Sequence, residues 1–259
     1  MSLFSKLLGK SKPAPAAPTF SAPIAPEQSF FAIGDIHGSL EPFRATLRVI
    51  ETIEERPTVI CVGDYVDRGE ESAEILNLLK RLNTEFPDLF LCLKGNHEEM
   101  MLNFLDDPGK HGRRWLRHGG LQTVASFGLG YNAETALETL RDQLADAMGP
   151  DMIDWMRNLP DRWQSGNVAV VHAGADPSVP IDLQAQRTLL WGHPEFVTKP
   201  RSDETWVLHG HTIVKTPHAR AGRIAVDTGA YATGVLTTAY VCTNGEVEFF
   251  TNMLDVSAL

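Results

Sequence analysis

The sequence lacks an uninterrupted apolar run of about 18 residues, the length that a helix needs to cross a bilayer. Cysteine is also scarce, because the chain contains only Cys61, Cys92 and Cys242. An odd, widely spaced set of this kind does not make a disulfide framework, and free thiols are typical of a reducing compartment. We therefore expect a cytoplasmic globular protein without stable membrane insertion.

Positively charged side chains are also few compared with negatively charged ones. The 259 residues include 23 lysines and arginines against 33 aspartates and glutamates, which gives a formal net charge of −10. An acidic chain repels phosphate backbones, so nucleic acid is not expected as a partner unless a metal or a local basic cleft reverses the field. The hydrophobic share of 43% supplies a substantial core and argues against general disorder.

Residues 1–29 are predicted to form a disordered or extended tail, because residues 11–28 are rich in proline, alanine and serine and lack hydrophobic periodicity. Its first ten residues, MSLFSKLLGK, mix apolar and lysine side chains, and a short amphipathic helix in weak contact with a membrane surface is one interpretation. A solvated tail is favoured, because so few apolar side chains bind a membrane weakly. No secretory cleavage pattern follows. The folded domain is expected over residues 30–259.

From residue 30 onward, short apolar runs alternate with helical patterns. The runs at 30–35, 58–64 and 89–95 each end in Gly or Gly-Asp, and leucine and isoleucine recur at helical spacing between them. This β-α-β-α-β order predicts parallel strands joined by helices. Residues 98–160 are predicted to form a helical insertion.

A second set of strands is predicted at 168–174, 205–211, 223–229, 235–242 and 246–252. The last two are joined by Thr243-Asn244-Gly245, which is typical of a hairpin turn. The predicted fold class is therefore α/β, with a two-sheet β-sandwich flanked by helices, and ligands are expected at the carboxyl ends of the strands.

Polar residues follow five of these strands at the same end. They are Asp35 and His37, then Asp64, Asp67 and Arg68, then Asn96 and His97, then His172, and finally His209 and His211. Any one of these residues alone has a structural explanation, because an aspartate after a strand often caps the next helix and a single histidine is commonly structural. His111, His118 and His218 are interpreted as structural histidines of this kind. Burying the whole set together costs several kcal/mol unless a cation compensates.

Carboxylates, imidazoles and an amide oxygen are donors that suit manganese, iron or zinc rather than a thiolate-bound ion. The set exceeds the needs of one ion, so a site for two divalent metal ions about 3.5–4 Å apart is predicted, with one carboxylate bridging them. Such a pair acidifies water and stabilises an in-line displacement at phosphorus.

Five motifs carry a resemblance to a known family: GDIHG (34–38), GDYVDRG (63–69), GNHE (95–98), VHAG (171–174) and HGHT (209–212). Together they resemble the calcineurin-like metallophosphoesterases, and more narrowly the bacterial phosphoprotein (serine/threonine) phosphatase branch. That branch also includes symmetrical diadenosine tetraphosphate hydrolases. The resemblance covers residues 30–250 and implies a metallophosphoesterase catalytic domain over 30–259, with manganese favoured over iron or zinc.

The resemblance implies a role for each matched residue. Asp35 and His37 would bind the first metal, Asp64 would bridge both, and Asn96, His172 and His211 would bind the second. His97 would protonate the leaving alkoxide, oriented by Asp67, while Arg68 and Asn96 would contact the phosphate. An imidazole paired with a carboxylate supplies a proton near neutral pH, and a guanidinium offers two parallel donors to phosphate. His209 is expected to be structural.

Two departures from the family pattern bear on the substrate. Ile213 stands where many phosphodiesterases and nucleases of the superfamily place a further histidine, which favours the phosphatase branch. Leu190-Trp191-Gly192-His193 stands where bacterial members commonly have Leu-Trp-Ile-Arg. His193 is therefore predicted to contact the phosphate in place of an arginine, with Arg187 or Arg201 as alternative cations.

Basic side chains near the predicted site carry two interpretations. In the first interpretation, these side chains, which are Arg113, Arg114 and Arg117, attract an anionic substrate. In the second interpretation, they form a solvated face of a helix. Asp227 and Tyr231, in DTGAYATG (227–234), are expected to support the site or to lie on its rim.

The resemblance favours a metal-dependent phosphomonoester hydrolase that acts on phosphoserine or phosphothreonine in proteins. Symmetrical diadenosine tetraphosphate hydrolysis is the alternative, so the expected partner is a phosphoprotein or a small phosphorylated molecule. A catalytically inactive phospho-binding module is a third interpretation. It is disfavoured because every expected ligand and His97 are present.

Overall fold

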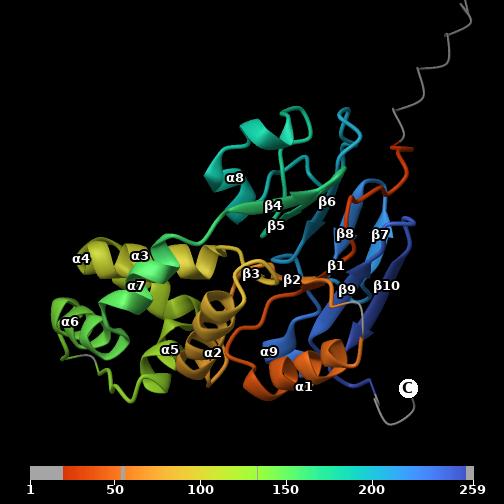
Figure 1. The fold of residues 1–259 in the computed structure, drawn as a ribbon. Helices are drawn as coiled ribbons and strands as arrows, with labels where there is room; N and C mark the ends of the chain where they lie inside the picture. Colours follow the sequence, from red (N-terminus) through yellow and green to blue (C-terminus); the bar gives the residue numbers. More distant parts are fainter. Residues whose placement is uncertain (1–19, 54–55, 133, 255–259) are drawn as a thin grey trace, which may run out of the picture.

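The computed structural model describes residues 20–53, 56–132 and 134–254, which form two facing sheets with helices on the outer sides (Figure 1). Among these residues, every helix is too short or too polar to cross a bilayer. The α/β class and the two-sheet sandwich flanked by helices are confirmed.

The first sheet has the strand order β10 (Val247–Thr251), β9 (Thr237–Val241), β1 (Phe30–Ile33), β2 (Thr58–Cys61) and β3 (Phe90–Cys92). Strands β1, β2 and β3 are parallel, and Cys61 pairs with both Ile33 and Cys92, so the three strands end at one level. β9 and β10 form the predicted hairpin, in which the Gly245 N–H donates to the Cys242 carbonyl at 2.9 Å.

The second sheet has the order β4 (Arg162–Ser165), β5 (Val168–Val171), β6 (Trp206–His209), β8 (Arg223–Ala225) and β7 (His218–Arg220). Strands β5, β6 and β8 are parallel. β4 and β7 are edge strands that the sequence patterns did not predict. Both are short and partly exposed, so they lack the continuous apolar run that identifies a buried strand.

Alternation along β1 divides the core between two layers. Phe30 and Ala32 face the second sheet and pack with Val168, Val170 and Leu208 in the sandwich interior. Phe31 and Ile33 face the opposite way, into the larger core beneath the helices. Because both faces of β1 are buried, its run is apolar throughout rather than alternating.

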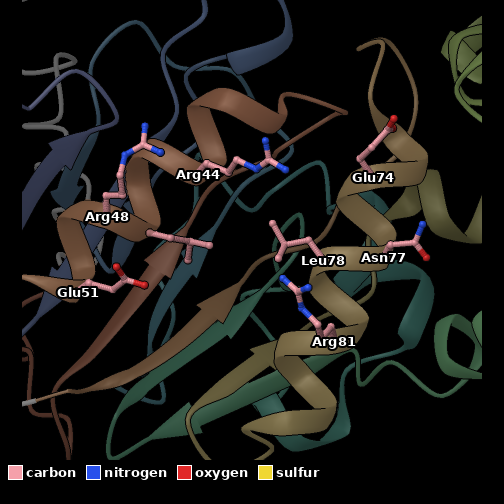
Figure 2. Close-up of a pocket in the computed structure, with 8 residues that line it drawn as sticks. Arg44, Arg48, Glu51, Glu74, Asn77, Leu78 and Arg81 are labelled. Carbon is pink, nitrogen blue, oxygen red and sulfur yellow. The ribbon is translucent and has the colours of Figure 1, made fainter.

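Two crossover helices cover the first sheet, α1 (Leu40–Glu51) and α2 (Ser72–Glu85). A surface cleft of about 460 Å³ lies between them, and Arg48 and Arg81 are among the charged side chains that line it (Figure 2). None of the predicted site residues lines this cleft.

The insertion consists of α3 (Asn96–Asp106), α4 (Pro108–Trp115), a π-helical turn (Leu116–Gly120), α5 (Leu121–Ser126), α6 (Leu137–Met148) and α7 (Pro150–Arg157). In α6, Leu140, Leu144 and Met148 recur at helical spacing and are buried in the larger core. Shorter helical segments follow at η3 (Ile181–Leu183), α8 (Gln186–Trp191) and α9 (Ala230–Thr233).

The described part of the predicted tail, residues 20–29, runs along the second sheet. Phe20 contacts Trp206 edge-on with ring centroids 5.2 Å apart, and the Trp206 indole donates to the Ala22 carbonyl at 3.0 Å. The Ala25 N–H donates to Asn167 at 2.8 Å. These ten residues are therefore packed against the domain, while the amphipathic segment predicted at 1–10 lies outside the described residues.

Candidate metal centre

The candidate site lies where the parallel strands of both sheets end. Backbone turns with positive φ aim its side chains inward, with φ 44° at His37, 53° at Asp64 and 60° at His211. Asp67 and Arg68 share this conformation. Non-glycine residues adopt it at a cost of about 1–3 kcal/mol each, and such strain persists where the surrounding structure fixes it, commonly at functional sites.

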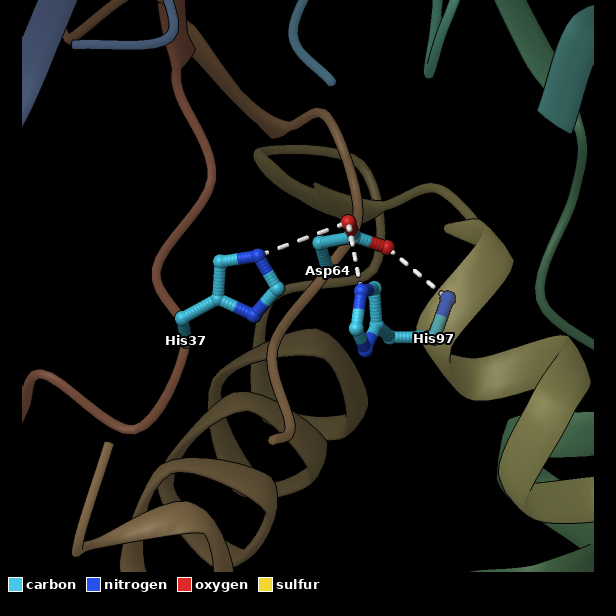
Figure 3. Close-up of side chains that lie close together, drawn as sticks. All are labelled: His37, Asp64 and His97. Atoms are coloured by element: carbon cyan, nitrogen blue, oxygen red, sulfur yellow. Dashed lines mark hydrogen bonds and ion pairs between the residues drawn. The ribbon is translucent and has the colours of Figure 1, made fainter. Parts of the chain in front are cut away.

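Asp64 is the centre of the cluster. Its Oδ2 lies 3.5 Å from the His37 Nε2, and the His97 backbone N–H donates to Oδ1 at 3.0 Å (Figure 3). The same Oδ1 lies 3.3 Å from the His172 Nε2. Two groups of donor atoms fall within 4.8 Å of one another: His37, Asp64 and His97, and Asp64, His172 and His211. Asp64 belongs to both groups, which is the placement a bridging ligand requires.

The ring orientation of His37 fits a metal ligand. Its Nδ1 lies 2.7 Å from the Val66 carbonyl, so Nδ1 carries the proton and Nε2 is left with a lone pair. That Nε2 is buried without a hydrogen-bond partner. Burial lowers the pKa of His37 to about 3, so the ring is neutral, as a metal-binding imidazole must be.

His172 presents the same arrangement on the other side of Asp64. Its Nδ1 faces the Val62 carbonyl at 3.1 Å, while its Nε2 faces the Asn96 Oδ1 at 2.9 Å and the Asp64 carboxylate. Burial alone would lower the pKa of His172, but the Asp64 charge outweighs it and raises the pKa. The His172 Nε2, the Asn96 Oδ1 and an Asp64 carboxylate oxygen converge at this point. Each of them can accept a hydrogen bond or bind a cation, so a proton or a cation must lie among them.

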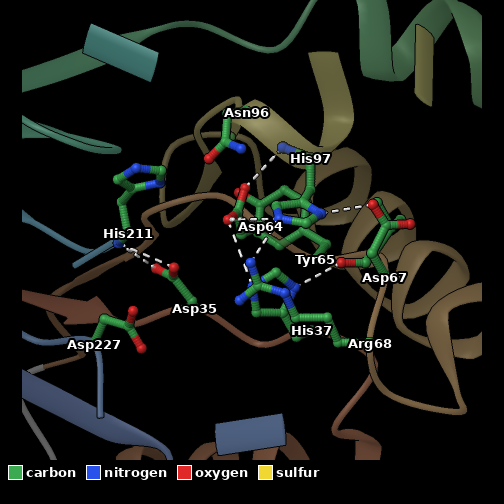
Figure 4. A network of polar contacts seen from close by, with 12 residues as sticks. Asp35, His37, Asp64, Tyr65, Asp67, Arg68, Asn96, His97, His211 and Asp227 are labelled. Atoms are coloured by element: carbon green, nitrogen blue, oxygen red, sulfur yellow. Dashed lines mark hydrogen bonds and ion pairs between the residues drawn. The ribbon is translucent and has the colours of Figure 1, made fainter. Parts of the chain in front are cut away.

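Asp35 lies beside this cluster, with both carboxylate oxygens accepting the His211 backbone N–H at 3.0–3.1 Å (Figure 4). Burial, followed by the charges of Asp227 and Asp64, raises its pKa well above the usual range. Three carboxylates are thus buried close together, and a cation relieves the repulsion among them. Together with the unpartnered His37 nitrogen, they fit two divalent ions.

A second polar pair stands next to Asp64. The His97 Nδ1 donates to Asp67 at 2.6 Å, and Asp67 also accepts from Trp115 at 3.0 Å and from Thr123 at 2.7 Å. Burial would lower the pKa of His97, but the Asp64 and Asp67 carboxylates raise it. The His97 Nε2 faces the Arg68 guanidinium at 3.1 Å. This is a firmly held imidazole with one nitrogen directed at the site.

Glu98 was not predicted to have a role, although it belongs to the GNHE motif. Its fully buried carboxylate accepts the backbone N–H groups of Asp64 at 2.9 Å, Tyr65 at 2.8 Å and Gly95 at 2.9 Å. Burial raises its pKa to about 7, and the Asp64 charge adds to this. Glu98 therefore holds the loop that presents Asp64. Its place in the first turn of α3 is the sequence signal for a capping role.

The remaining predicted residues lie away from the two donor groups. The His193 Nε2 lies 3.6 Å from Asp176, and its role toward phosphate stays a prediction. Arg201 is buried and pairs with Asp203, so it is not free to replace a phosphate-binding arginine. His209 packs edge-on against Phe196 at 4.9 Å, and burial lowers its pKa to about 4.

Comparison with known proteins identifies the family to which this sequence belongs. Residues 29–215 match the calcineurin-like phosphoesterase family, and the chain belongs to that family of metallophosphoesterases.

Its relatives fall into two groups by name. The chain is 30% identical over 149 residues to a symmetrical bis(5'-nucleosyl)-tetraphosphatase of Chromobacterium violaceum, a match that covers 58% of this chain but only 44% of that relative. It is 25% identical over 220 residues to serine/threonine-protein phosphatase 2 of Salmonella typhimurium, covering 80% and 90% of the two chains. The crystal structure of a candidate diadenosine tetraphosphatase shares the fold, with a TM-score of 0.60, 19% identity and coverage of 89% and 98%.

Proposed function

We propose that this metallophosphoesterase is a phosphomonoesterase that removes phosphate from phosphoserine and phosphothreonine in proteins. The observation that carries the proposal is the His97–Asp67 pair beside the Asp64-centred cluster, with the Arg68 guanidinium 3.1 Å from the His97 Nε2. A phosphomonoester with an alkoxide leaving group needs a proton donor, an anion clamp and a source of hydroxide, and these groups supply all three.

In this mechanism, Asp35, His37 and Asp64 would hold one divalent ion, and Asp64, Asn96, His172 and His211 would hold the other. When bound, the ions neutralise phosphoryl charge and lower the pKa of water. We take manganese as the preferred ion.

The remaining residues act on the substrate. Arg68 turns from His97 to two phosphoryl oxygens, which a guanidinium binds with parallel donors. Once Arg68 has turned away, the His97 Nε2 takes up a proton from water, which the raised pKa of His97 favours, and donates it to the leaving oxygen while Asp67 retains the bond to Nδ1. Because Asp67 is fully buried and accepts from two further donors, the Trp115 indole and the Thr123 hydroxyl, the imidazole is held in one tautomer and orientation.

Among the two sequence relatives, coverage supports the phosphatase over the dinucleotide hydrolase, whereas the fold match to the candidate diadenosine tetraphosphatase covers 98% of that structure. The match extends over 90% of the serine/threonine-protein phosphatase but over less than half of the tetraphosphatase. Symmetrical hydrolysis of diadenosine tetraphosphate stays the second candidate, because the tetraphosphatase match has the higher identity, 30% against 25%. A cytoplasmic location is part of the proposal, supported by the buried free thiols of Cys61 and Cys92.

The deciding experiment compares three substrates with purified protein and manganese: p-nitrophenyl phosphate, a phosphoserine peptide and diadenosine tetraphosphate. We expect chelator-sensitive phosphate release from the first two. A preference for diadenosine tetraphosphate, with two ADP molecules as products, would establish the second candidate instead. Absence of metal-dependent turnover of any of them would favour a phospho-binding module.

A further inference from the structure

An open groove leads from the candidate metal centre onto the helical insertion. Its inner half, about 610 Å³, is lined by Arg68, Tyr231 and residues of the stretch 116–122. Its outer half, about 420 Å³, is lined by Arg113, Tyr131 and part of the same stretch. The two halves share Leu116, Arg117 and Leu121 in their linings and therefore adjoin each other. We call this surface the insertion groove.

The inner end of the insertion groove is built onto the site itself. The Arg68 backbone N–H donates to the Gly119 carbonyl at 3.2 Å, and the Arg68 guanidinium lies 4.8 Å from the centre of the Tyr231 ring. The Tyr231 ring in turn lies 5.4 Å from that of His37. A phosphate held by Arg68 therefore places the rest of its substrate at the mouth of the groove.

Gly119 makes this contact with a φ of 109°, and a Cβ added there would lie 2.5 Å from the Arg68 nitrogen. A side chain at this position would therefore clash with the Arg68 backbone. The π-helical turn of the insertion and the phosphate-binding arginine are thus in direct backbone contact.

The charge of the groove is opposite to that of the chain. Arg113 and Arg117 are exposed, and within the described residues neither takes part in an ion pair. The Arg117 Nε donates to the Arg113 carbonyl at 3.1 Å, which directs that side chain along the helix surface. Unpaired guanidinium groups on a chain of net charge −10 form a local attractive site for carboxylates.

The same groove carries apolar surface. Leu121 is 46% exposed and Tyr131 is 36% exposed, and both line the outer half beside the arginines. Cationic and apolar side chains in one groove complement a peptide that carries acidic and apolar residues.

We propose that the insertion groove binds the residues on one side of the phosphorylated residue in a protein substrate, and that it selects flanks with acidic and apolar side chains. This inference rests on the proposed phosphatase function and adds its substrate class.

The test uses phosphoserine peptides of equal length whose flanks carry aspartate, asparagine or lysine. We expect kcat/KM for the aspartate flank to exceed that for the asparagine flank about fivefold at low salt, and the lysine flank to be the poorest. The ratio between aspartate and asparagine flanks should fall toward one in Arg113→Gln/Arg117→Gln and at about 0.5 M salt. In Arg113→Glu/Arg117→Glu, the lysine flank should become the preferred one.

The matched control is Arg48→Gln/Arg81→Gln in the cleft between α1 and α2 (Figure 2). It changes the net charge by the same amount at a place that no site residue lines, so the flank ratio should stay at the wild-type value. An equal change in the control, or an unchanged ratio in the groove variant, would overturn the inference.

Turnover of p-nitrophenyl phosphate separates this inference from the proposed function. If the wild-type protein hydrolyses this compound in a metal-dependent way but shows no flank preference, only the groove assignment fails. If it hydrolyses no phosphomonoester, the phosphatase function fails. If Arg113→Gln/Arg117→Gln lowers turnover of diadenosine tetraphosphate and leaves the flank ratio intact, the groove serves nucleotides and the peptide assignment is wrong.

Discussion

The two sheets contribute to the metal centre in unequal ways. The loops of the first sheet are held by dedicated buried partners: Glu98 fixes the Asp64 loop, and Trp115 and Thr123 fix Asp67. The loops of the second sheet supply His172 and His211, and these are oriented by groups of the first.

The His172 Nδ1 bonds to the Val62 carbonyl, and the His211 backbone N–H bonds to Asp35. The candidate metal centre is thus organised by one sheet, while the other contributes candidate ligands across the sandwich. Substitutions in the first sheet's loops should therefore have the larger effects.

The largest effect is expected from Asp64→Asn. This change removes the charge shared by both donor groups, and we expect kcat/KM on p-nitrophenyl phosphate to fall about 10³-fold or more. Metal content measured by mass spectrometry should fall for both positions together. Retention of one full equivalent of manganese with only a small loss of activity would contradict a bridging role.

His97→Asn should reduce kcat on a phosphoserine peptide by about 10²–10³-fold without loss of bound metal. The reduction should be smaller on p-nitrophenyl phosphate, because a phenolate leaves without protonation. Asp67→Asn is the matched variant and should show the same dependence on the leaving group. Equal losses on both substrates would remove the assignment of His97 as the acid.

Glu98→Gln tests whether the first sheet's loop depends on its buried support. The amide puts a donor among four backbone N–H groups, so we expect a loss of about 2 kcal/mol in unfolding free energy. Urea denaturation with chelator present measures this directly. A midpoint equal to that of the wild type would show that the Asp64 loop is held by other contacts.

The smallest effect concerns the second sheet's loops and depends on pH. Burial would raise the pKa of Asp203, but Arg201 outweighs it and lowers that pKa. A lowered pKa stabilises the fold above the unfolded-state value of about 3.9, and this contribution is lost as pH falls through the folded-state value.

Asp203→Asn should therefore cost about 1 kcal/mol or less at pH 7 and progressively less below about pH 4. Paired denaturation curves at both pH values measure this. Activity on p-nitrophenyl phosphate should match that of the wild type. A difference in stability that grows on acidification would reverse the sign assigned to the ion pair.

Much of the fold follows from local patterns. Continuous apolar runs identified β1, β2, β3, β5 and β6, because strands buried on both faces have no polar alternation to obscure them. β4 and β7 were missed because an edge strand is stabilised by pairing with its neighbour, which no local pattern encodes.

The site was predictable only in part. The motifs placed the residues that the structure brings together around Asp64, because each follows a strand that ends at the same edge. The support from Glu98 depends on four backbone N–H groups, three of them more than 30 positions away in the chain, and a motif does not contain that contact. Asp227 was expected to lie near the site, but its burial beside Asp35 became evident only in three dimensions.

The segment from residue 20 to residue 29 determines on which side of the domain an amino-terminal attachment lies. Phe20 lies against Trp206 and Gly222, at the amino ends of β6 and β8, whereas the candidate metal centre lies at the carboxyl ends. A fluorophore, surface anchor or fusion partner joined directly to Phe20 is thus attached at the end of the sandwich opposite the candidate metal centre. Immobilisation of the protein through that end should leave the candidate metal centre and the insertion groove accessible to substrate.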